Sequence, residues 1–330
     1  MAVYTRLTDG QIADYATAFG LGTLVRADGI AQGTINSVYD VHTTHGRFIL
    51  RILEDRPAED VAFESQLVAC LHGAGLRVPR MHATAAGDWF VSLSSRQHIS
   101  FFDFLPGVEP ARCDVSARYA RQVGRFMGEM HGACESLTMR RANPFGPKQV
   151  SEILTYCREA PSAPGDVVTL DGLRDAVSAF SWPEDLPMGV VHGDLFVDNT
   201  RFSEEALCGV FDFEMASSGP LVFDLAVAIA DWGFCNGDTV LDLGCARELV
   251  LGYQEHRLLT SAEKLALFGL CSYVTARYTA SRYYDFEVRV REDAERQYKD
   301  YRVFLSRFQT IKALGAEAFA RGVLKSLDAP

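Results

Sequence analysis

Two polar clusters, each next to a short apolar run, stand in the middle of the sequence. In the segment VVHGDLFVDNTRF, which begins at Val190, two aspartates, a histidine and an asparagine follow the apolar run, and the segment GVFDFE further on carries Asp212. Runs this short are typical of buried strands, and catalytic groups tend to lie on loops that a rigid scaffold positions. We therefore expect Asp194, Asn199 and Asp212 to lie at neighbouring loop ends.

The donor atoms in these clusters are oxygens. Asp194, Asn199 and Asp212 offer carboxylate and amide oxygens, with one histidine, His192, beside them and no sulfur. Such a donor set suits Mg²⁺ better than zinc. Phosphoryl transfer needs a carboxylate that accepts the proton of the acceptor hydroxyl, and two oxygen ligands that hold Mg²⁺ on the nucleotide phosphates. The three residues meet that need.

The complete pattern is more informative than its parts. An Asp or Asn in a turn is more often a turn residue than a catalyst, and a histidine at this place can simply brace the loop. The order H-G-D-x-x-x-x-N, followed by an apolar strand that carries D-F, is however the order found in kinase catalytic centres. The pattern therefore predicts phosphoryl transfer, with His192 as a structural member of the loop.

Length and charge exclude several classes of protein. A chain of 330 residues, 48% apolar and 23% charged, has the composition of a folded globular protein and can bury a large core. Its net charge of -11, without a block of Lys or Arg, argues against binding to nucleic acid, because phosphate contacts need a basic face. We expect a fully folded protein that binds no nucleic acid.

Cysteine usage and the N-terminal segment indicate the compartment. The eight cysteines are scattered and form no C-x-x-C pair, which is typical of reduced thiols in a cytosolic protein. The start MAVYTRLTDGQIADYATAFG has no basic stretch followed by an apolar one, and no run approaches the length of a membrane span. We expect a cytoplasmic protein without a membrane partner, and the sequence leaves monomer or homodimer open.

Strand patterns gather in the first part of the chain. The segment NSVYDVHTTHGRFILRILE alternates apolar and polar residues around a turn at His45-Gly46, which predicts a hairpin. The segment AEDVAFESQLVACLHGAGL places Phe63, Leu67 and Leu71 on one face of a helix. The segment FVSLSSRQHISFFDFLPG then predicts two further strands, so a β-rich lobe begins the protein.

The remainder of the chain has helical periodicity. In SARYARQVGRFMGEMHGACES, six residues form one apolar helical stripe that we expect to pack in a core: Tyr119, Val123, Phe126, Met127, Met130 and Cys134. The patterns predict an α+β fold of two lobes. The small β-rich lobe spans residues 1–105 and the larger, mainly helical lobe spans residues 106–330.

Three segments resemble a known superfamily. HGDLFVDN, GVFDFE and GPLVFDLA are similar to the aminoglycoside phosphotransferase and choline kinase superfamily, which has a protein-kinase-like fold, and the resemblance covers most of the chain. The opening MAVYT and the stretches GIAQGTINSVYDVHTT, DLPMGVVHGDLFVDN, LVLGYQEHRLLTSAE and ASRYYDF are similar to bacterial homoserine kinases of this fold. The resemblance implies an N-terminal nucleotide-binding lobe and a C-terminal catalytic and acceptor-binding lobe.

The resemblance also implies roles for the residues of the two clusters. Asp194 would be the catalytic base, and Asn199 and Asp212 would be the Mg²⁺ ligands. Asp224, in the segment FDLA, would be a buried aspartate that braces the catalytic region, and His192 would be structural.

The nucleotide-binding residues implied by the resemblance lie in the first lobe. Arg51 stands where a kinase usually has its phosphate-contacting lysine, and a guanidinium can hold phosphate oxygens with two hydrogen bonds. Glu64, on the following helix, would pair with Arg51, although a solvated strand arginine is the alternative interpretation. The segment GIAQGTINS would cover the phosphates with Gly29, Gly33, Asn36 and Ser37, although it lacks the G-x-G-x-x-G of protein kinases.

An amino-acid acceptor needs a cation for its carboxylate. The segment YVTARYTASRYYDFEVRVRED supplies Arg277, Arg282 and Asp285 as candidate acceptor ligands, with Tyr278 and Tyr284 available to wall the site. A solvated, salt-bridged helix explains the same residues equally well, because long charged helices are usually exposed.

Three functions remain after these arguments. The resemblance implies an ATP- and Mg²⁺-dependent small-molecule kinase that converts L-homoserine to O-phospho-L-homoserine, in threonine biosynthesis. A choline, ethanolamine, aminoglycoside or amino-sugar kinase of the same superfamily is the alternative. A catalytically inactive binding module is the third, and the presence of Asp194, Asn199 and Asp212 together argues against it.

Overall fold

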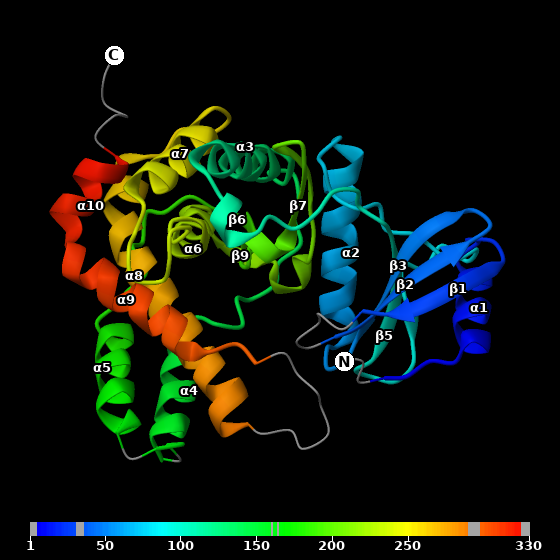
Figure 1. Ribbon diagram of the computed structural model, residues 1–330, viewed down its shortest axis with the longest axis horizontal. Coiled ribbons are helices and arrows are strands. Elements are labelled where there is room, and N and C mark those ends of the chain that lie inside the picture. The colour runs from blue at the N-terminus through cyan, green and yellow to red at the C-terminus, as the bar shows by residue number, and fades with distance from the viewer. Residues whose placement is uncertain (1–4, 31–35, 160, 164, 290–297, 325–330) are drawn as a thin grey trace. The chain divides into compact units, whose positions relative to one another are not determined.

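The computed structural model describes residues 5–30, 36–159, 161–163, 165–289 and 298–324. These residues form two compact units. Unit 1 holds the described residues up to Pro106 together with Tyr298, and unit 2 holds Gly107 to Arg289 and Lys299 to Leu324. Unit 1 is rich in strands and unit 2 is mainly helical (Figure 1), which confirms the predicted α+β fold.

Unit 1 is built on a five-stranded antiparallel sheet with the order β1-β2-β3-β5-β4. Its strands are β1 (Leu24–Gly29), β2 (Ser37–Thr43), β3 (Gly46–Leu53), β4 (Val91–Ser92) and β5 (His98–Asp103). The hairpin predicted at His45-Gly46 is confirmed, because β2 and β3 pair in register on either side of this turn. Side chains alternate along β2 between buried and half-buried, as a strand with one face on a core requires.

Two helices pack in unit 1, α1 (Asp9–Ala18) and α2 (Ala58–Gly73). A capping box starts α1, since the Thr8 side chain accepts from the Gln11 backbone and the Gln11 side chain accepts from the Thr8 backbone. Ile12 and Ala16 then join the core against the sheet. The apolar stripe predicted for the second helix is buried in α2, which ends at Gly73.

Unit 2 contains eight α-helices in its described part, and a π-helical turn at Tyr284–Val288 continues the long helix α8. The helices are α3 (Ala117–Ala133), α4 (Pro147–Glu159), α5 (Asp166–Ser178), α6 (Val222–Trp232), α7 (Leu243–Gln254), α8 (Ser261–Tyr283), α9 (Tyr301–Leu314) and α10 (Ala316–Val323). Two short antiparallel pairs complete it: β6 (Met188–Val191) with β9 (Ser217–Pro220), and β7 (Thr200–Ser203) with β8 (Ala206–Val210).

Helix α6 is the core element of unit 2. Every residue from Val222 to Trp232 is buried, and the helix lies among the other elements of the unit (Figure 1). An apolar surface on all sides is typical of a helix enclosed by protein. Its two charged residues, Asp224 and Asp231, are therefore exceptions that need buried partners.

Helices α3 and α7 pack with their backbones in contact. A Cβ atom at Gly124 would lie 2.0 Å from the Leu249 carbonyl oxygen, and one at Gly252 would lie 2.1 Å from the Arg121 carbonyl oxygen. The stripe predicted for α3 faces the core as expected, except that Tyr119 is half-buried. The two glycines thus set the distance between these helices.

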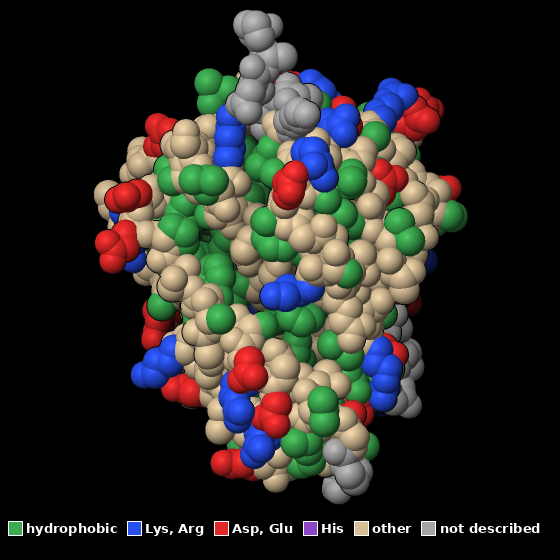
Figure 2. Space-filling view, turned by 90° about the vertical axis from the view of Figure 1, so that its left-hand side faces the viewer, with side chains coloured by type: hydrophobic (Ala, Val, Ile, Leu, Met, Phe, Trp, Pro, Cys, Tyr) green, Lys and Arg blue, Asp and Glu red, His purple; other side chains and the backbone are tan. Residues whose placement is uncertain are grey.

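The state of the cysteines, the lengths of the helices and the surface charges can be compared with the sequence. All eight cysteines are free thiols. None of the described helices has the length and apolar content that a membrane span requires. Lys and Arg side chains are interspersed with Asp and Glu side chains on the face of unit 2 that carries α10 (Figure 2).

Candidate active site

The loop of residues 192–199 follows β6 in unit 2 and is held by backbone hydrogen bonds. The Asp224 carboxylate accepts from His192 N at 2.7 Å and from Gly193 N at 2.9 Å. Gly193 has a φ of 77°, and a Cβ atom there would lie 2.8 Å from the Met215 carbonyl oxygen. The turn before Asp194 therefore requires glycine.

His192 is a structural residue of this loop. Its side chain is fully buried, and its Nε2 atom lies 3.2 Å from the Phe211 carbonyl oxygen. Burial lowers the pKa of His192, so the ring is neutral at physiological pH. The Phe213 ring packs against it.

Asp194 is partly exposed, and its carboxylate has two polar neighbours. The Tyr278 hydroxyl lies 2.7 Å from Asp194 Oδ1, and Asn199 Nδ2 lies 3.3 Å from Asp194 Oδ2 and 2.7 Å from the Asp194 carbonyl oxygen. Removal from water and the charge of Asp198 raise the pKa of Asp194, which comes to about 6. The Tyr278 hydrogen bond and the charge of Arg277 act in the opposite direction. The carboxylate is thus held in place and accessible.

Asp212 lies at the same end of the β7–β8 hairpin as Asn199. Thr200 pairs with Val210, and Phe211 N donates to the Asn199 carbonyl oxygen at 3.1 Å. The prediction that a strand runs through Asp212 was wrong, because β8 ends at Val210. Asp212 has a φ of 66° and a ψ of 63°, a left-handed conformation that breaks the strand and that aspartate tolerates better than most residues.

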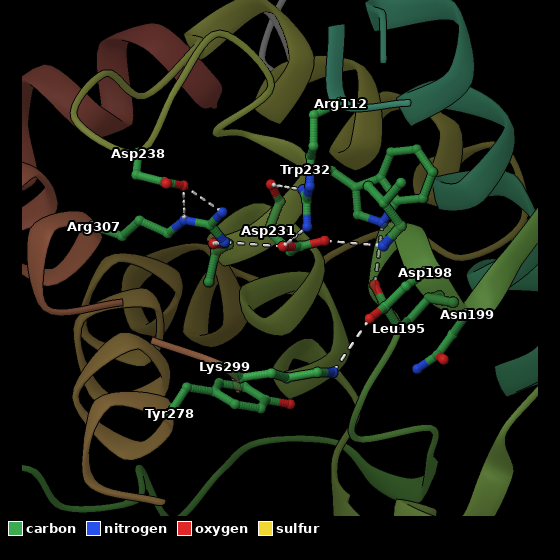
Figure 3. Close-up of polar contacts among 12 residues, drawn as sticks. Arg112, Leu195, Asp198, Asn199, Asp231, Trp232, Asp238, Tyr278, Lys299 and Arg307 are labelled. Atoms are coloured by element: carbon green, nitrogen blue, oxygen red, sulfur yellow. Dashed lines mark hydrogen bonds and ion pairs between the residues drawn. The ribbon is translucent and has the colours of Figure 1, made fainter. Parts of the chain in front are cut away.

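A second buried carboxylate, that of Asp231, holds the other end of the loop (Figure 3). It accepts from Val197 N at 2.9 Å, and it pairs with Arg112 at 2.6 Å and with Arg307 at 2.9 Å. Burial alone would raise the pKa of Asp231, but the charges of the two arginines outweigh burial and lower it. The sequence did contain a signal for this residue, because Asp231 interrupts the apolar run of α6.

Arg277 is a buried cation beside Asp194. Its side chain is 4% exposed, and its guanidinium lies 4.0 Å from the centre of the Phe145 ring and 3.8 Å from that of the Tyr278 ring. Within the described residues, its buried Nε atom has no hydrogen-bond partner. The solvated-helix interpretation is thus wrong for Arg277. A buried donor without a hydrogen-bond partner is costly, which indicates a place for a ligand that accepts a hydrogen bond from this guanidinium.

The other candidate acceptor ligands lie elsewhere on the same segment. The Arg282 guanidinium lies 4.4 Å from the centre of the Phe304 ring, and its Nη1 atom is 3.4 Å from the Asp300 carbonyl oxygen. Asp285 lies in the π-helical turn that contacts α4, where its charge acts on Cys157. The charges of Arg277 and Arg282 both interact with Asp194. Arg277 has the clearer link, because its guanidinium stacks on the Tyr278 ring, whose hydroxyl contacts Asp194.

A further ion pair of this site could not be predicted from the sequence. Lys299 Nζ lies 3.4 Å from Asp198 Oδ2 (Figure 3). Asp198 belongs to the motif itself, so its position was a signal, but Lys299 is 101 residues away in the chain and no local pattern points to it.

Unit 1 contains the candidate nucleotide-binding residues. Arg51 and Glu64 form an ion pair of 2.6 Å, and both are buried, so a solvated strand arginine is excluded. Ser37 Oγ lies 2.5 Å from Glu54 Oε1, and Asn36 Oδ1 lies 3.4 Å from Glu54 N. Two glycines were also expected to take part: Gly29 ends β1, and Gly33 lies outside the described residues.

One unit is rich in strands and contains a buried Arg–Glu pair, and the other is helical and contains the loop that joins Asp194 to Asn199. These features define a protein-kinase-like phosphotransferase. A family model, that of the phosphotransferase enzyme family, matches residues 26–259. The chain belongs to the phosphotransferase enzyme family, and it is a kinase-like enzyme that phosphorylates a small molecule on a hydroxyl group.

Known proteins are similar to the chain over most of its length. It is 34% identical over 289 residues to a homoserine kinase of Granulibacter bethesdensis, and the matched region covers 87% of this chain and 89% of that protein. It is 34% identical over 291 residues to a homoserine kinase of Gluconacetobacter diazotrophicus, with coverage of 87% and 89%. The solved structure of amicoumacin kinase hAmiN with AMP-PNP, Ca²⁺ and Ami has a TM-score of 0.67 at 16% identity, with coverage of 88% and 89%, and shows the shared fold.

Proposed function

We propose that the chain transfers the γ-phosphoryl group of ATP to the hydroxyl group of L-homoserine, giving O-phospho-L-homoserine, in the cytoplasm. Curated relatives that match most of the chain are homoserine kinases. The observation that carries the proposal is the buried guanidinium of Arg277 beside Asp194. The carboxylate of an amino-acid acceptor would supply the hydrogen-bond acceptor that the Nε atom of Arg277 lacks among the described residues.

Asp194 is the proposed catalytic base. The acceptor hydroxyl oxygen forms a bond to the γ-phosphorus while the bond from that phosphorus to the leaving oxygen of ADP breaks, and Asp194 takes the hydroxyl proton. Tyr278 and Asn199 hold the carboxylate in one orientation, which reduces the entropy lost on reaching the transition state.

Asn199 and Asp212 are the proposed magnesium ligands. The amide nitrogen of Asn199 is used by Asp194, so its amide oxygen is the atom available for a metal. Asp212 follows β8 at the same end of the hairpin, and carboxylate and amide oxygens are the donors that Mg²⁺ prefers. A bound Mg²⁺ would neutralise charge on the nucleotide phosphates.

Arg51 is the proposed phosphate ligand of unit 1, oriented by Glu64 as the lysine of a kinase is oriented by its glutamate. Gly29 and Gly33 would let the backbone approach the phosphates, and Asn36 and Ser37 would contribute polar groups. Arg282 and Asp285 are further proposed ligands of the acceptor.

An acceptor panel tests the proposal. ADP release is measured with ATP and Mg²⁺ for L-homoserine, choline and kanamycin, and each product is identified by phosphorus NMR. We expect the highest kcat/KM for L-homoserine, because a buried arginine favours a carboxylate over a purely cationic acceptor. A higher kcat/KM for choline or kanamycin would refute the acceptor, and no phosphorylated product from any of them would refute the proposed reaction.

A further inference from the structure

Asp198, in the loop that carries Asp194, forms a long ion pair with Lys299 (Figure 3). Its length of 3.4 Å exceeds the roughly 2.7 to 2.9 Å of a strong charge-assisted hydrogen bond. The side chains of Lys299 and Asp198 are 33% and 40% exposed, so both can be reached from solvent. Asp198 Oδ1 is itself buried and has no hydrogen-bond partner among the described residues, so the exposed part of the side chain is not this oxygen. This carboxylate can therefore accept a further donor.

Charged groups of both signs surround Asp198. Burial and the charge of Asp198 raise the pKa of Glu109, whereas nearby cations, Lys299 among them, lower it. Asp198 also raises the pKa of Asp194, and Lys299 again acts in the opposite direction. Three carboxyl groups from two segments therefore share one electrostatic neighbourhood, in which a further positive group at Asp198 would add to the cations that offset their repulsion.

Arg277 provides the independent observation that a ligand belongs here. It is 4% exposed, lacks a partner for Nε in the part of the chain that the structure describes, and stacks on the Tyr278 ring. The hydroxyl group of that same tyrosine contacts Asp194. One neighbourhood therefore offers a site for an anion at Arg277, a site for a cation at Asp198, and a base at Asp194.

We infer that Asp198 binds the ammonium group of the acceptor while Arg277 binds its carboxylate, so that the site selects a zwitterionic amino acid with a terminal hydroxyl group. This inference rests on the proposed function and adds the residue that recognises the amino group. Lys299 holds one oxygen of Asp198, and the soft terminal torsion of an aspartate lets the carboxylate turn its other oxygen to the ammonium. Lys299 is then a positioning residue.

Two truncated acceptors separate the two ends of the zwitterion. The compound 4-hydroxybutyrate is homoserine without the amino group, and 3-amino-1-propanol is homoserine without the carboxylate. The enzyme is assayed with all three acceptors as wild type, as Asp198→Asn and as Arg277→Met. Where a truncated acceptor is phosphorylated too slowly to measure, its inhibition constant for the phosphorylation of homoserine is measured instead of kcat/KM.

We expect Asp198→Asn to reduce kcat/KM for L-homoserine about 10- to 100-fold, the usual effect of losing a hydrogen bond to a charged group, and to leave 4-hydroxybutyrate within about threefold of wild type. Arg277→Met should show the mirror pattern, with a smaller loss for 3-amino-1-propanol than for L-homoserine, because both acceptors share its effect on Asp194 and only homoserine also loses the carboxylate contact. Asp175→Asn, an exposed aspartate on α5, is the matched control and should change none of the three values.

The acceptors also distinguish the possible failures. If Asp198→Asn reduces the values for homoserine and 4-hydroxybutyrate by the same factor, Asp198 only shapes the loop and the inference is wrong. If wild-type enzyme phosphorylates choline or kanamycin but not homoserine, the proposed function itself fails. Thermal melting of each variant, monitored by circular dichroism, shows whether a loss reflects unfolding.

Discussion

The carboxylates of Asp224 and Asp231, which lie on the buried helix α6, accept backbone hydrogen bonds on opposite sides of Asp194. Two helical turns separate them, so both point from one face of α6 toward the loop. Asp224 holds the turn before Asp194, and Asp231 holds Val197 after it. The loop is thus fixed at both ends by one rigid helix.

Replacing Asp231 with asparagine should destabilise the protein by about 3 kcal/mol, because the buried Arg307 loses one of its two carboxylate partners and keeps only Asp238. Arg112 loses its partner as well. The free energy of unfolding is measured by urea titration. An unchanged value would mean that Asp231 contributes only a backbone hydrogen bond.

Measuring the unfolding free energies of wild type and Asp231→Asn at several pH values isolates the contribution of the Asp231 charge. The pKa of Asp231 is lowered in the folded protein, so its stabilisation is present above the ordinary aspartate pKa of about 4 and is lost as the pH falls below that value. The difference in unfolding free energy between wild type and Asp231→Asn should therefore shrink with acidification. A difference that stays constant from pH 7 to acidic pH would contradict the role of the charge.

Asp194→Asn should lower turnover by roughly 10² to 10⁴, the usual range for a positioned acid or base, and should leave nucleotide affinity nearly unchanged. Steady-state turnover and equilibrium binding of an ATP analogue check the two parts. The exposed Asp175→Asn serves as the control for loss of a carboxylate. Near wild-type turnover of the Asp194 variant would remove it as the base.

Asp212→Asn should abolish Mg²⁺-dependent activity without disturbing the backbone, because asparagine also tolerates the left-handed conformation at this position. Asp212→Ala should lose the same activity and some stability as well. Activity is measured over a range of Mg²⁺ concentrations. If both variants respond to Mg²⁺ as wild type does, Asp212 is a turn residue only.

Gly124→Ala should destabilise the protein by about 3 kcal/mol, since the new methyl group would meet the backbone of α7 and overpacking of this kind is costly. Gly132→Ala on the same helix is the matched control. No atom lies within 4 Å of its added Cβ, so this change should be neutral or slightly stabilising. Equal unfolding temperatures for the two variants would show that α3 and α7 can separate at no cost.

Local patterns predicted the elements whose determinants are close in sequence. The hairpin at His45-Gly46 and the helix ending at Gly73 depend on alternation and on glycine, both of which can be read locally. The left-handed Asp212 could not be predicted in this way, because its conformation follows from the packing of the turn after β8.

The long-range partners of the site also escaped prediction. Arg112 and Asp231 are 119 residues apart in the chain, and Arg307 and Asp231 are 76 apart, so only the fold brings them together. The resemblance did imply that Asp224 braces this region, as its hydrogen bonds to the loop confirm, but no pattern pointed to the arginines that pair with Asp231. For Arg277 the sequence left open a ligand or a solvated side chain; its burial excludes the second, and its role as a ligand stays a prediction.

Calorimetric titration of L-homoserine into the wild-type enzyme, with Mg²⁺ and an inert ATP analogue present, measures binding of the acceptor without turnover. We expect clear binding heat, and an affinity about 10- to 100-fold weaker in Arg277→Met, as for the loss of a hydrogen bond to a charged group. Binding of the ATP analogue should be unchanged. No heat for L-homoserine, together with clear binding of choline or an aminoglycoside, would contradict the proposed acceptor.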